Sequence, residues 1–377
     1  MTSTAGRDGS DRGKTVLVAA PSGFCAGVER AVTTVERALA LYGAPVYVRG
    51  QIVHNRVVVD QLRRQGAVFV SEVDEVPEGA VVILSAHGVA PRVRAAADSR
   101  GLLTIDATCP LVSKVHREAR RFASEGYDVL LIGEPGHDEV VGTVGVAPER
   151  TTVVAGLDGV DAVQVADPDR VAWLAQTTLT VDETTRVAAA LRERFPRLVD
   201  PPSDDICYAA QNRQAATQRV AAASDLVLVV GSANSHNSTR LVQVALAAGT
   251  PAYLVEGPDD VRPEWLEGDP EVVGLTAGAS APRLSTDAVL AMLAERGYGE
   301  VRTVEVAREN QVFTLPRELD QPRPRSPRAT STSSAIAPIV GSASTSSSLS
   351  DTPNSLRTVA RKRTAASELP PSSKKLS

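Results

Sequence analysis

One pattern occurs three times in this chain, and it constrains the fold more than any other feature. Cys109 and Cys207 are each followed by a helical stretch and then by an apolar strand that reaches a glycine 24 residues after the cysteine. The pattern that starts at Cys25 has one extra residue, so that its glycine, Gly50, comes 25 residues later. A cysteine, a helix and a strand in the same order three times predict three related α/β units.

Short runs of valine and leucine alternate with helical periods from residue 14 to about residue 319, which favours an α/β fold with parallel sheets. The clearest strands are expected at 81–84, 129–132 and 226–230. We place the three units at 14–100, 101–199 and 200–319. Arranged with pseudo-threefold symmetry, they would have small parallel sheets around a common centre, and open parallel sheets bind ligands at the carboxyl ends of their strands.

The two ends of the chain differ from this body. Residues 1–13 are polar, and residues 320–377 are rich in serine, threonine and proline without any apolar period, so both are predicted to be disordered. Residues 321–377 carry a net charge of +7, and residues 1–320 carry −12. Two interpretations of this basic tail remain open: an arm that attracts an acidic protein, or a solvated extension with no role. It has no aromatic side chains for base stacking, so we expect no nucleic-acid partner.

Composition also limits where the protein works. No run of about 18 apolar residues is present, so no membrane span is expected. The N-terminus lacks the apolar core of a signal peptide, which favours a cytoplasmic location. Three cysteines, an odd number, do not form a disulfide framework.

The equivalent places of the three cysteines suggest a shared role. Helix N-termini favour thiolates, and three thiolates that converge suit a metal centre. Zinc sites normally use closely spaced cysteines, whereas the gaps here are 84 and 98 residues. Iron–sulfur clusters usually take four cysteines, so three would leave one iron without a protein ligand. Three unrelated core cysteines are the remaining alternative.

Polar residues follow the strands of each unit and indicate what the centre acts on. Hydrogen-bond donors on loops beside helix N-termini suit a phosphate group. These donors are His54, His87, Ser235, Asn237 and Ser280. Glu139 and Thr177, both in the middle unit, are candidates for a proton relay.

Nine motifs in this order carry a resemblance to a known family. They are GFCAGVERAV, VHN, SAHGV, DATCPLV, GHDEVVGTVG, QTTL, ICYAAQNRQ, NSHNSTRL and TAGASAP. Together, across about residues 14–319, the chain resembles the 4-hydroxy-3-methylbut-2-enyl diphosphate reductases, also called LytB. The resemblance implies a pseudo-threefold α/β protein with one central 4Fe-4S cluster held by three cysteines.

The resemblance also implies a role for each matching residue. Cys25, Cys109 and Cys207 would hold the cluster. The diphosphate would be bound by His54, His87, Ser235, Asn237 and Ser280, with His137 and Thr177 near the substrate. Glu139 would deliver protons, with Thr177 and His137 nearby. His236 stands where many relatives have serine, and its imidazole can also donate a hydrogen bond to the diphosphate.

The implied reaction is reductive dehydroxylation of the substrate to isopentenyl or dimethylallyl diphosphate, the last step of the methylerythritol phosphate pathway to isoprenoids. The implied electron donor is ferredoxin or flavodoxin. A different class of protein stays open, namely a non-catalytic iron–sulfur sensor or diphosphate-binding protein of the same fold. A sensor needs the cysteines but not a proton relay, so Glu139 together with Thr177 favours the enzyme.

Overall fold

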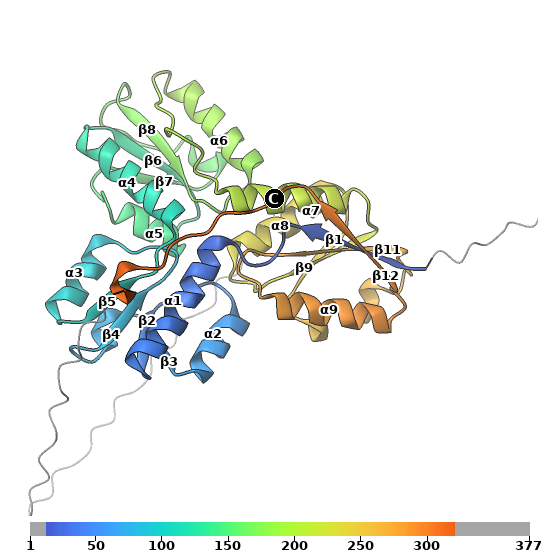
Figure 1. Ribbon diagram of the computed structural model, residues 1–377. Helices are drawn as coiled ribbons and strands as arrows, with labels where there is room; N and C mark the ends of the chain where they lie inside the picture. Colours follow the sequence, from blue (N-terminus) through green and yellow to red (C-terminus); the bar gives the residue numbers. More distant parts are fainter. Residues whose placement is uncertain (1–12, 321–377) are drawn as a thin grey trace, which may run out of the picture. The chain divides into compact units, whose positions relative to one another are not determined.

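The computed structural model describes residues 13–320, in which helices and strands alternate around three separate sheets (Figure 1). All strand pairings within these sheets are parallel. The predicted α/β fold with small parallel sheets is therefore confirmed. The disorder predicted for the N-terminus and for the basic tail concerns residues that lie outside the described part, apart from Gly13 and Asp320.

The first sheet has four strands in the order β3-β2-β4-β5. They are β2 (Val46–Arg49), β3 (Ala67–Val70), β4 (Val81–Leu84) and β5 (Leu103–Asp106). Its helices are α1 (Ala26–Tyr42), α2 (Arg56–Arg64) and α3 (Pro91–Ser99). All four residues of β4 are buried, which explains why this strand reads as a continuous apolar run rather than an alternating one.

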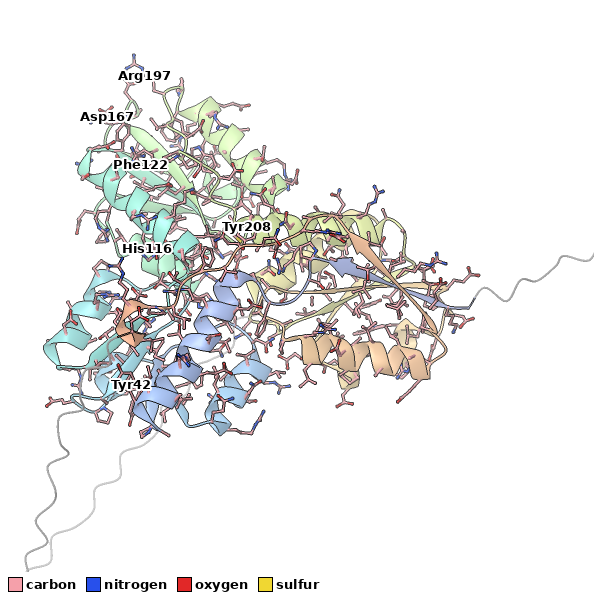
Figure 2. The ribbon with its side chains drawn as sticks, viewed as in Figure 1. Tyr42, His116, Phe122, Asp167, Arg197 and Tyr208 are labelled. Atoms are coloured by element: carbon pink, nitrogen blue, oxygen red, sulfur yellow. The ribbon has the colours of Figure 1, made fainter. Side chains whose placement is uncertain are left out.

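The second sheet has three strands in the order β7-β6-β8. They are β6 (Asp128–Ile132), β7 (Thr151–Val154) and β8 (Val171–Ala175). Its helices are α4 (Pro110–Ser124), α5 (Asp138–Val144) and α6 (Val181–Arg194). Phe122 of α4, labelled in Figure 2, packs with Leu131 of β6 in a core that covers one face of this sheet.

The third sheet has five strands in the order β10-β9-β11-β1-β12. They are β1 (Thr15–Ala20), β9 (Leu226–Val230), β10 (Ala252–Val255), β11 (Val272–Ala277) and β12 (Glu300–Glu305). Its helices are α7 (Tyr208–Ala221), α8 (His236–Ala247) and α9 (Arg283–Glu295). The three strands expected from the clearest apolar runs are thus present as β4, β6 and β9.

The predicted units were 14–100, 101–199 and 200–319. Two strands belong to a different sheet from the one that this division assigns to them. Strand β1 lies in the third sheet, where Val16 is fully buried and pairs with Val273. Strand β5 lies in the first sheet, where Ile105 pairs with Ile83 of β4. Apolar patterns predict that a strand forms, but the sheet it joins depends on contacts that are distant in sequence.

The chain after β12 leaves the third sheet and returns to the first (Figure 1). Leu319 packs in the core beneath α1, and the hydroxyl of Tyr42 donates a hydrogen bond to the Glu318 carbonyl (3.3 Å). Segment 306–320 thus connects two sheets that lie at opposite ends of the sequence. Among residues 13–320, none of the helices is long and apolar enough to cross a membrane.

Candidate functional site

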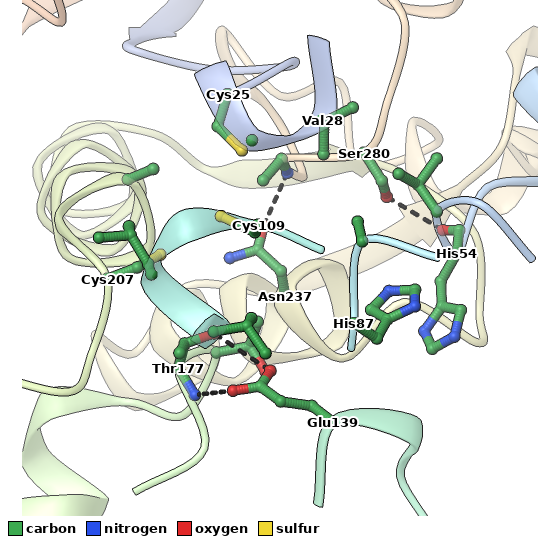
Figure 3. Close-up of a pocket in the computed structure, with 18 of the residues that line it drawn as sticks. Cys25, Val28, His54, His87, Cys109, Glu139, Thr177, Cys207, Asn237 and Ser280 are labelled. Atoms are coloured by element: carbon green, nitrogen blue, oxygen red, sulfur yellow. Dashed lines mark hydrogen bonds between the residues drawn. The ribbon is translucent and has the colours of Figure 1, made fainter. Parts of the chain in front are cut away.

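The three cysteines line one pocket, although the gaps between them are 84 and 98 residues (Figure 3). Each one is the residue directly before a helix: Cys25 before α1, Cys109 before α4 and Cys207 before α7. The Sγ atom of Cys207 accepts a hydrogen bond from the backbone N–H of Ala210 (3.2 Å). Tyr208, labelled in Figure 2, comes next in the chain and lines the same pocket.

Gly27 shows how closely the sulfur atoms approach the backbone. A Cβ atom at this position would lie 2.8 Å from the Sγ of Cys109 and 3.8 Å from the Sγ of Cys25. The shorter distance is well inside van der Waals contact, so any side chain here would displace Cys109. Two sulfur atoms from different units therefore flank the same small volume beside α1.

Burial and the helix N-termini have opposite effects on the pKa of the cysteine thiols. It raises the pKa of the Cys109 thiol to about 11, even though the backbone N–H groups of Leu111 and Val112 act in the opposite direction. It also strongly raises the pKa of Cys207. The expected stabilisation of thiolates at helix N-termini is thus outweighed by desolvation, and thiolates at these positions need a bound cation to balance their charge.

Glu139 and Thr177 form a buried pair in this pocket (Figure 3). Glu139 lies in the first turn of α5, and its side chain is 2% exposed. Its Oε1 accepts the backbone N–H of Thr177 (2.6 Å), and its Oε2 accepts the Thr177 hydroxyl (3.1 Å). Burial raises the pKa of Glu139 to about 7, although the two bonds from Thr177 lower it. This carboxyl group can therefore hold or release a proton near neutral pH.

Histidines from two units gather on another side of the pocket. The rings of His54 and His87 are stacked, with centroids 3.9 Å apart, and His137 stands edge-on to both. Burial lowers the pKa of His137 to about 3 and that of His87 well below its usual value. The Nδ1 of His137 accepts the backbone N–H of Glu139 (3.2 Å), which leaves Nε2 as the donor nitrogen of the neutral ring.

Small polar side chains at the start of α8 complete the lining. Ser235 is the capping residue of α8, and its hydroxyl lies 3.3 Å from that of Ser280, which donates to the backbone carbonyl of His54 (3.0 Å). The Oδ1 of Asn237 accepts the N–H of Ala279 (2.7 Å). Because the amide oxygen faces Ala279, the amide nitrogen Nδ2 is the end that is left to act as a donor.

The structure adds partners that were not among the residues predicted from the sequence. Asp138 lies 3.3 Å from the Nε2 of His54, and this contact holds the pKa of Asp138 at about 2. His236 lies within 2.6 Å of a carboxylate oxygen of Glu134, and Phe313 lines the pocket from the segment that follows β12. Adjacency to His137 and Glu139 was a usable signal for Asp138. Nothing local marked Phe313, which arrives from the far end of the chain.

All the residues that sequence analysis assigned to the site thus line a single pocket, and what each of them does stays a prediction. Comparison with known proteins identifies the family. The family model described as LytB protein matches residues 16–294. The chain belongs to the LytB family. The resemblance found in the nine motifs is confirmed at this level.

Curated relatives in the LytB family are similar over most of their length. A protein of Mycobacterium ulcerans (strain Agy99), named 4-hydroxy-3-methylbut-2-enyl diphosphate reductase, is 62% identical over 305 residues, which cover 81% of this chain and 92% of the relative. A protein of the same name from Leifsonia xyli subsp. xyli (strain CTCB07) is 61% identical over 307 residues, covering 81% and 91%.

Solved structures agree with this assignment to the LytB family. The E-1-hydroxy-2-methyl-but-2-enyl-4-diphosphate reductase from Plasmodium falciparum matches with a TM-score of 0.79 and 36% identity, covering 82% of this chain and 97% of that one. A second structure, titled (E)-4-hydroxy-3-methyl-but-2-enyl diphosphate reductase, the terminal enzyme of the non-mevalonate pathway, matches with a TM-score of 0.55 and 33% identity, covering 75% and 99%.

Proposed function

We propose that this protein reduces (E)-4-hydroxy-3-methylbut-2-enyl diphosphate to isopentenyl and dimethylallyl diphosphate, the last step of the methylerythritol phosphate pathway. The substrate takes up two electrons and two protons, its bond to the hydroxyl oxygen breaks, and water leaves. The observation that carries the proposal is the buried Glu139–Thr177 pair, which lies in the same pocket as three cysteines. A sensor or a simple diphosphate-binding protein has no use for a proton donor at this place.

The cysteines fit one 4Fe-4S cluster as the cofactor. Cys25, Cys109 and Cys207 offer three soft thiolate ligands at the edge of one pocket, and such ligands select iron–sulfur clusters. The approach of two sulfur atoms to Gly27 shows that ligands from two different helix starts border the same small space. When bound, the cluster would supply the electrons of the reduction, which makes the protein an iron–sulfur oxidoreductase.

The opposite side of the pocket suits the diphosphate. His54, His87, Ser235, Asn237 and Ser280 provide N–H and O–H donors that converge from the first and third units. Burial holds the pKa of His87 well below its usual value, so this ring is neutral at pH 7 and offers one N–H donor. His236 would add a donor from the first residue of α8, where Glu134 orients its ring.

Glu139 would act as the proton donor. With a pKa of about 7, about half of these carboxyl groups carry the proton at neutral pH, which is the range in which general acids work best. Thr177 binds both carboxylate oxygens and would keep the group aimed into the pocket. His137 fixes the start of α5 through its bond to the Glu139 N–H and would lie near the reacting carbon atoms.

The two electrons must come from outside the chain. We infer that ferredoxin or flavodoxin delivers them, and that the protein works in the cytoplasm, where these small carriers are found. No nucleic acid enters this reaction.

Anaerobic purification followed by iron and sulfide analysis tests the proposal directly. We expect about four iron and four sulfide per chain, a visible absorption band, and conversion of the substrate to both products with a chemical reductant. Cys109→Ser and Glu139→Gln are the controls, since the first should lose the iron and the second should keep it. A wild-type protein without iron, or a loaded protein that does not consume the substrate, would refute the proposal.

A further inference from the structure

Each helix that begins at a cysteine carries a basic side chain about one and a half turns later. These side chains lie five, five and six residues after their cysteines. They are Arg30, Lys114 and Arg213, which follow Cys25, Cys109 and Cys207 respectively. Each of them donates hydrogen bonds to the loop that precedes another of the three cysteines.

Arg30 of α1 reaches the loop before Cys109. Its Nη1 donates to the carbonyl oxygen of Thr108 (3.1 Å), the residue directly before Cys109, and its Nη2 approaches the carbonyl of Asp106 (3.4 Å). Its Nε donates to the carbonyl of Thr314 (2.7 Å), in the segment that follows β12. Burial lowers the pKa of this guanidinium, although the nearby Asp106 and Cys109 act in the opposite direction.

Lys114 of α4 reaches the loop before Cys207. Its Nζ donates to the carbonyl oxygens of Ser203 (2.8 Å) and Asp204 (2.9 Å) and to Oδ1 of Asp205 (2.9 Å). These residues end two positions before Cys207. The Asp205 side chain is 1% exposed, so this ammonium–carboxylate contact is sheltered from water.

Arg213 of α7 completes the cycle, because it binds the loop before Cys25. Its Nε and Nη2 donate to the carbonyl oxygen of Gly23 (3.0 and 2.8 Å), and Nη2 also donates to that of Phe24 (3.1 Å). Phe24 directly precedes Cys25. The Arg213 side chain is 1% exposed, and its charge is balanced by Glu309, whose Oε1 accepts from Nη1 (3.0 Å).

We propose that Arg30, Lys114 and Arg213 form a ring of positioning residues that holds the three cysteine loops in register. The helix after Cys25 binds the loop before Cys109, the helix after Cys109 binds the loop before Cys207, and the helix after Cys207 binds the loop before Cys25. One such contact would be an ordinary helix–loop bond, but three in a single rotational order match the order of the cysteines. Hydrogen bonds from charged donors are short and strong, so each fixes the backbone beside one sulfur ligand.

This inference rests on the proposed iron–sulfur cluster, because the ring has a purpose only if the three sulfur atoms must hold a common group.

The test compares variants of the ring with matched controls on the same helices. The ring variants are Arg30→Gln, Lys114→Gln and Arg213→Lys, and the controls are the exposed Arg37→Gln, Arg120→Gln and Arg219→Gln. Arg213→Lys keeps the buried charge opposite Glu309 but loses the planar fork that spans two carbonyl oxygens. Each anaerobically loaded protein is mixed with an iron chelator, and the rate of iron release is followed by absorbance.

We expect the ring variants to release iron about tenfold to a hundredfold faster than wild type, since each loses charge-assisted hydrogen bonds. The controls should stay at the wild-type rate, and Lys114→Arg should recover most of the loss. In the metal-free proteins, alkylation of Cys207 should be faster in Lys114→Gln, where the loop before it is no longer held. Wild-type rates of release and alkylation in Lys114→Gln and Arg30→Gln would overturn the ring, as would equal acceleration in the controls.

The two proposals fail differently in this experiment. A wild-type protein that takes up no iron refutes the cluster, and the alkylation rates then still decide whether the ring holds the loops. If Arg213→Lys does not fold, Arg30→Gln and Lys114→Gln decide the outcome, because both side chains are less deeply buried than Arg213.

Discussion

Replacing Glu139 with glutamine removes a proton donor while leaving the shape of the pocket almost unchanged. The glutamine oxygen can accept the N–H of Thr177, as Oε1 does now, and its amide can donate to the Thr177 hydroxyl, which accepts as well as donates. Packing and both contacts are preserved, so the variant isolates the role of the proton.

The expected loss follows from that role. General acids contribute about a hundredfold to ten-thousandfold, so kcat should fall by this factor while the iron content stays the same. Because the pKa of Glu139 is about 7, the kcat of the wild type should fall as the pH rises through 7. Glu139→Gln should lack this decline, since its amide does not titrate.

Stability gives a second, independent measurement. Burial raises the pKa of Glu139 from 4.5 to about 7, so the folded state binds this proton more tightly than the unfolded state does. Below pH 4.5 both states hold the proton. As the pH rises from 4.5 to 7, the unfolded state releases it first, and the free energy of unfolding of the wild type falls by about 3 kcal/mol. Glu139→Gln should not show this loss and should be the more stable protein at pH 8.

The assays are single-turnover kinetics on the loaded enzyme and urea unfolding of the metal-free protein between pH 4 and 8. The exposed Glu149→Gln is the control and should match the wild type in both. A normal kcat in Glu139→Gln, with the decline through pH 7 retained, would show that another group supplies the proton. A stability difference that does not grow between pH 4.5 and 7 would show that Glu139 ionises as it does in water.

Three further substitutions test other parts of the pocket. Cys109→Ser should lose most of its iron and activity, and full iron content in this variant would remove Cys109 from the ligand set. His54→Ala should raise the Kd of the diphosphate substrate by about tenfold or more, with a smaller change in kcat, because it removes a donor to a charged group; an unchanged Kd in isothermal titration would contradict the binding role. Gly27→Ala should lower the iron content, because the new Cβ would lie 2.8 Å from the Cys109 sulfur. Normal iron loading of this variant would show that the loops can move apart.

Much of the fold could be predicted because it follows from local patterns of apolar residues in the sequence. The apolar runs of β4, β6 and β9 are continuous, as expected of strands buried on both faces, and each is followed by a helical period. The cysteines could be assigned to helix starts for the same reason, since a strand, a turn and a helix are adjacent in sequence. Their common role followed from the repeat, which is a property of the sequence itself.

Pairs that join distant segments could not be predicted from local patterns. The contact of His54 with Asp138 spans 84 residues, and that of Arg213 with Gly23 spans 190. The placement of β1 in the third sheet and the return of segment 306–320 to the first sheet are of the same kind. Each depends on which surfaces meet after the units have packed.

The sequence by itself therefore determined the elements, their repetition and the residue types available to the site. Only the tertiary structure decided the protonation of those residues. A glutamic acid with a pKa of about 7 and a cysteine with a pKa of about 11 owe these values to burial by side chains from several units. Desolvation is a sum over everything that surrounds a group, and no stretch of sequence contains that sum.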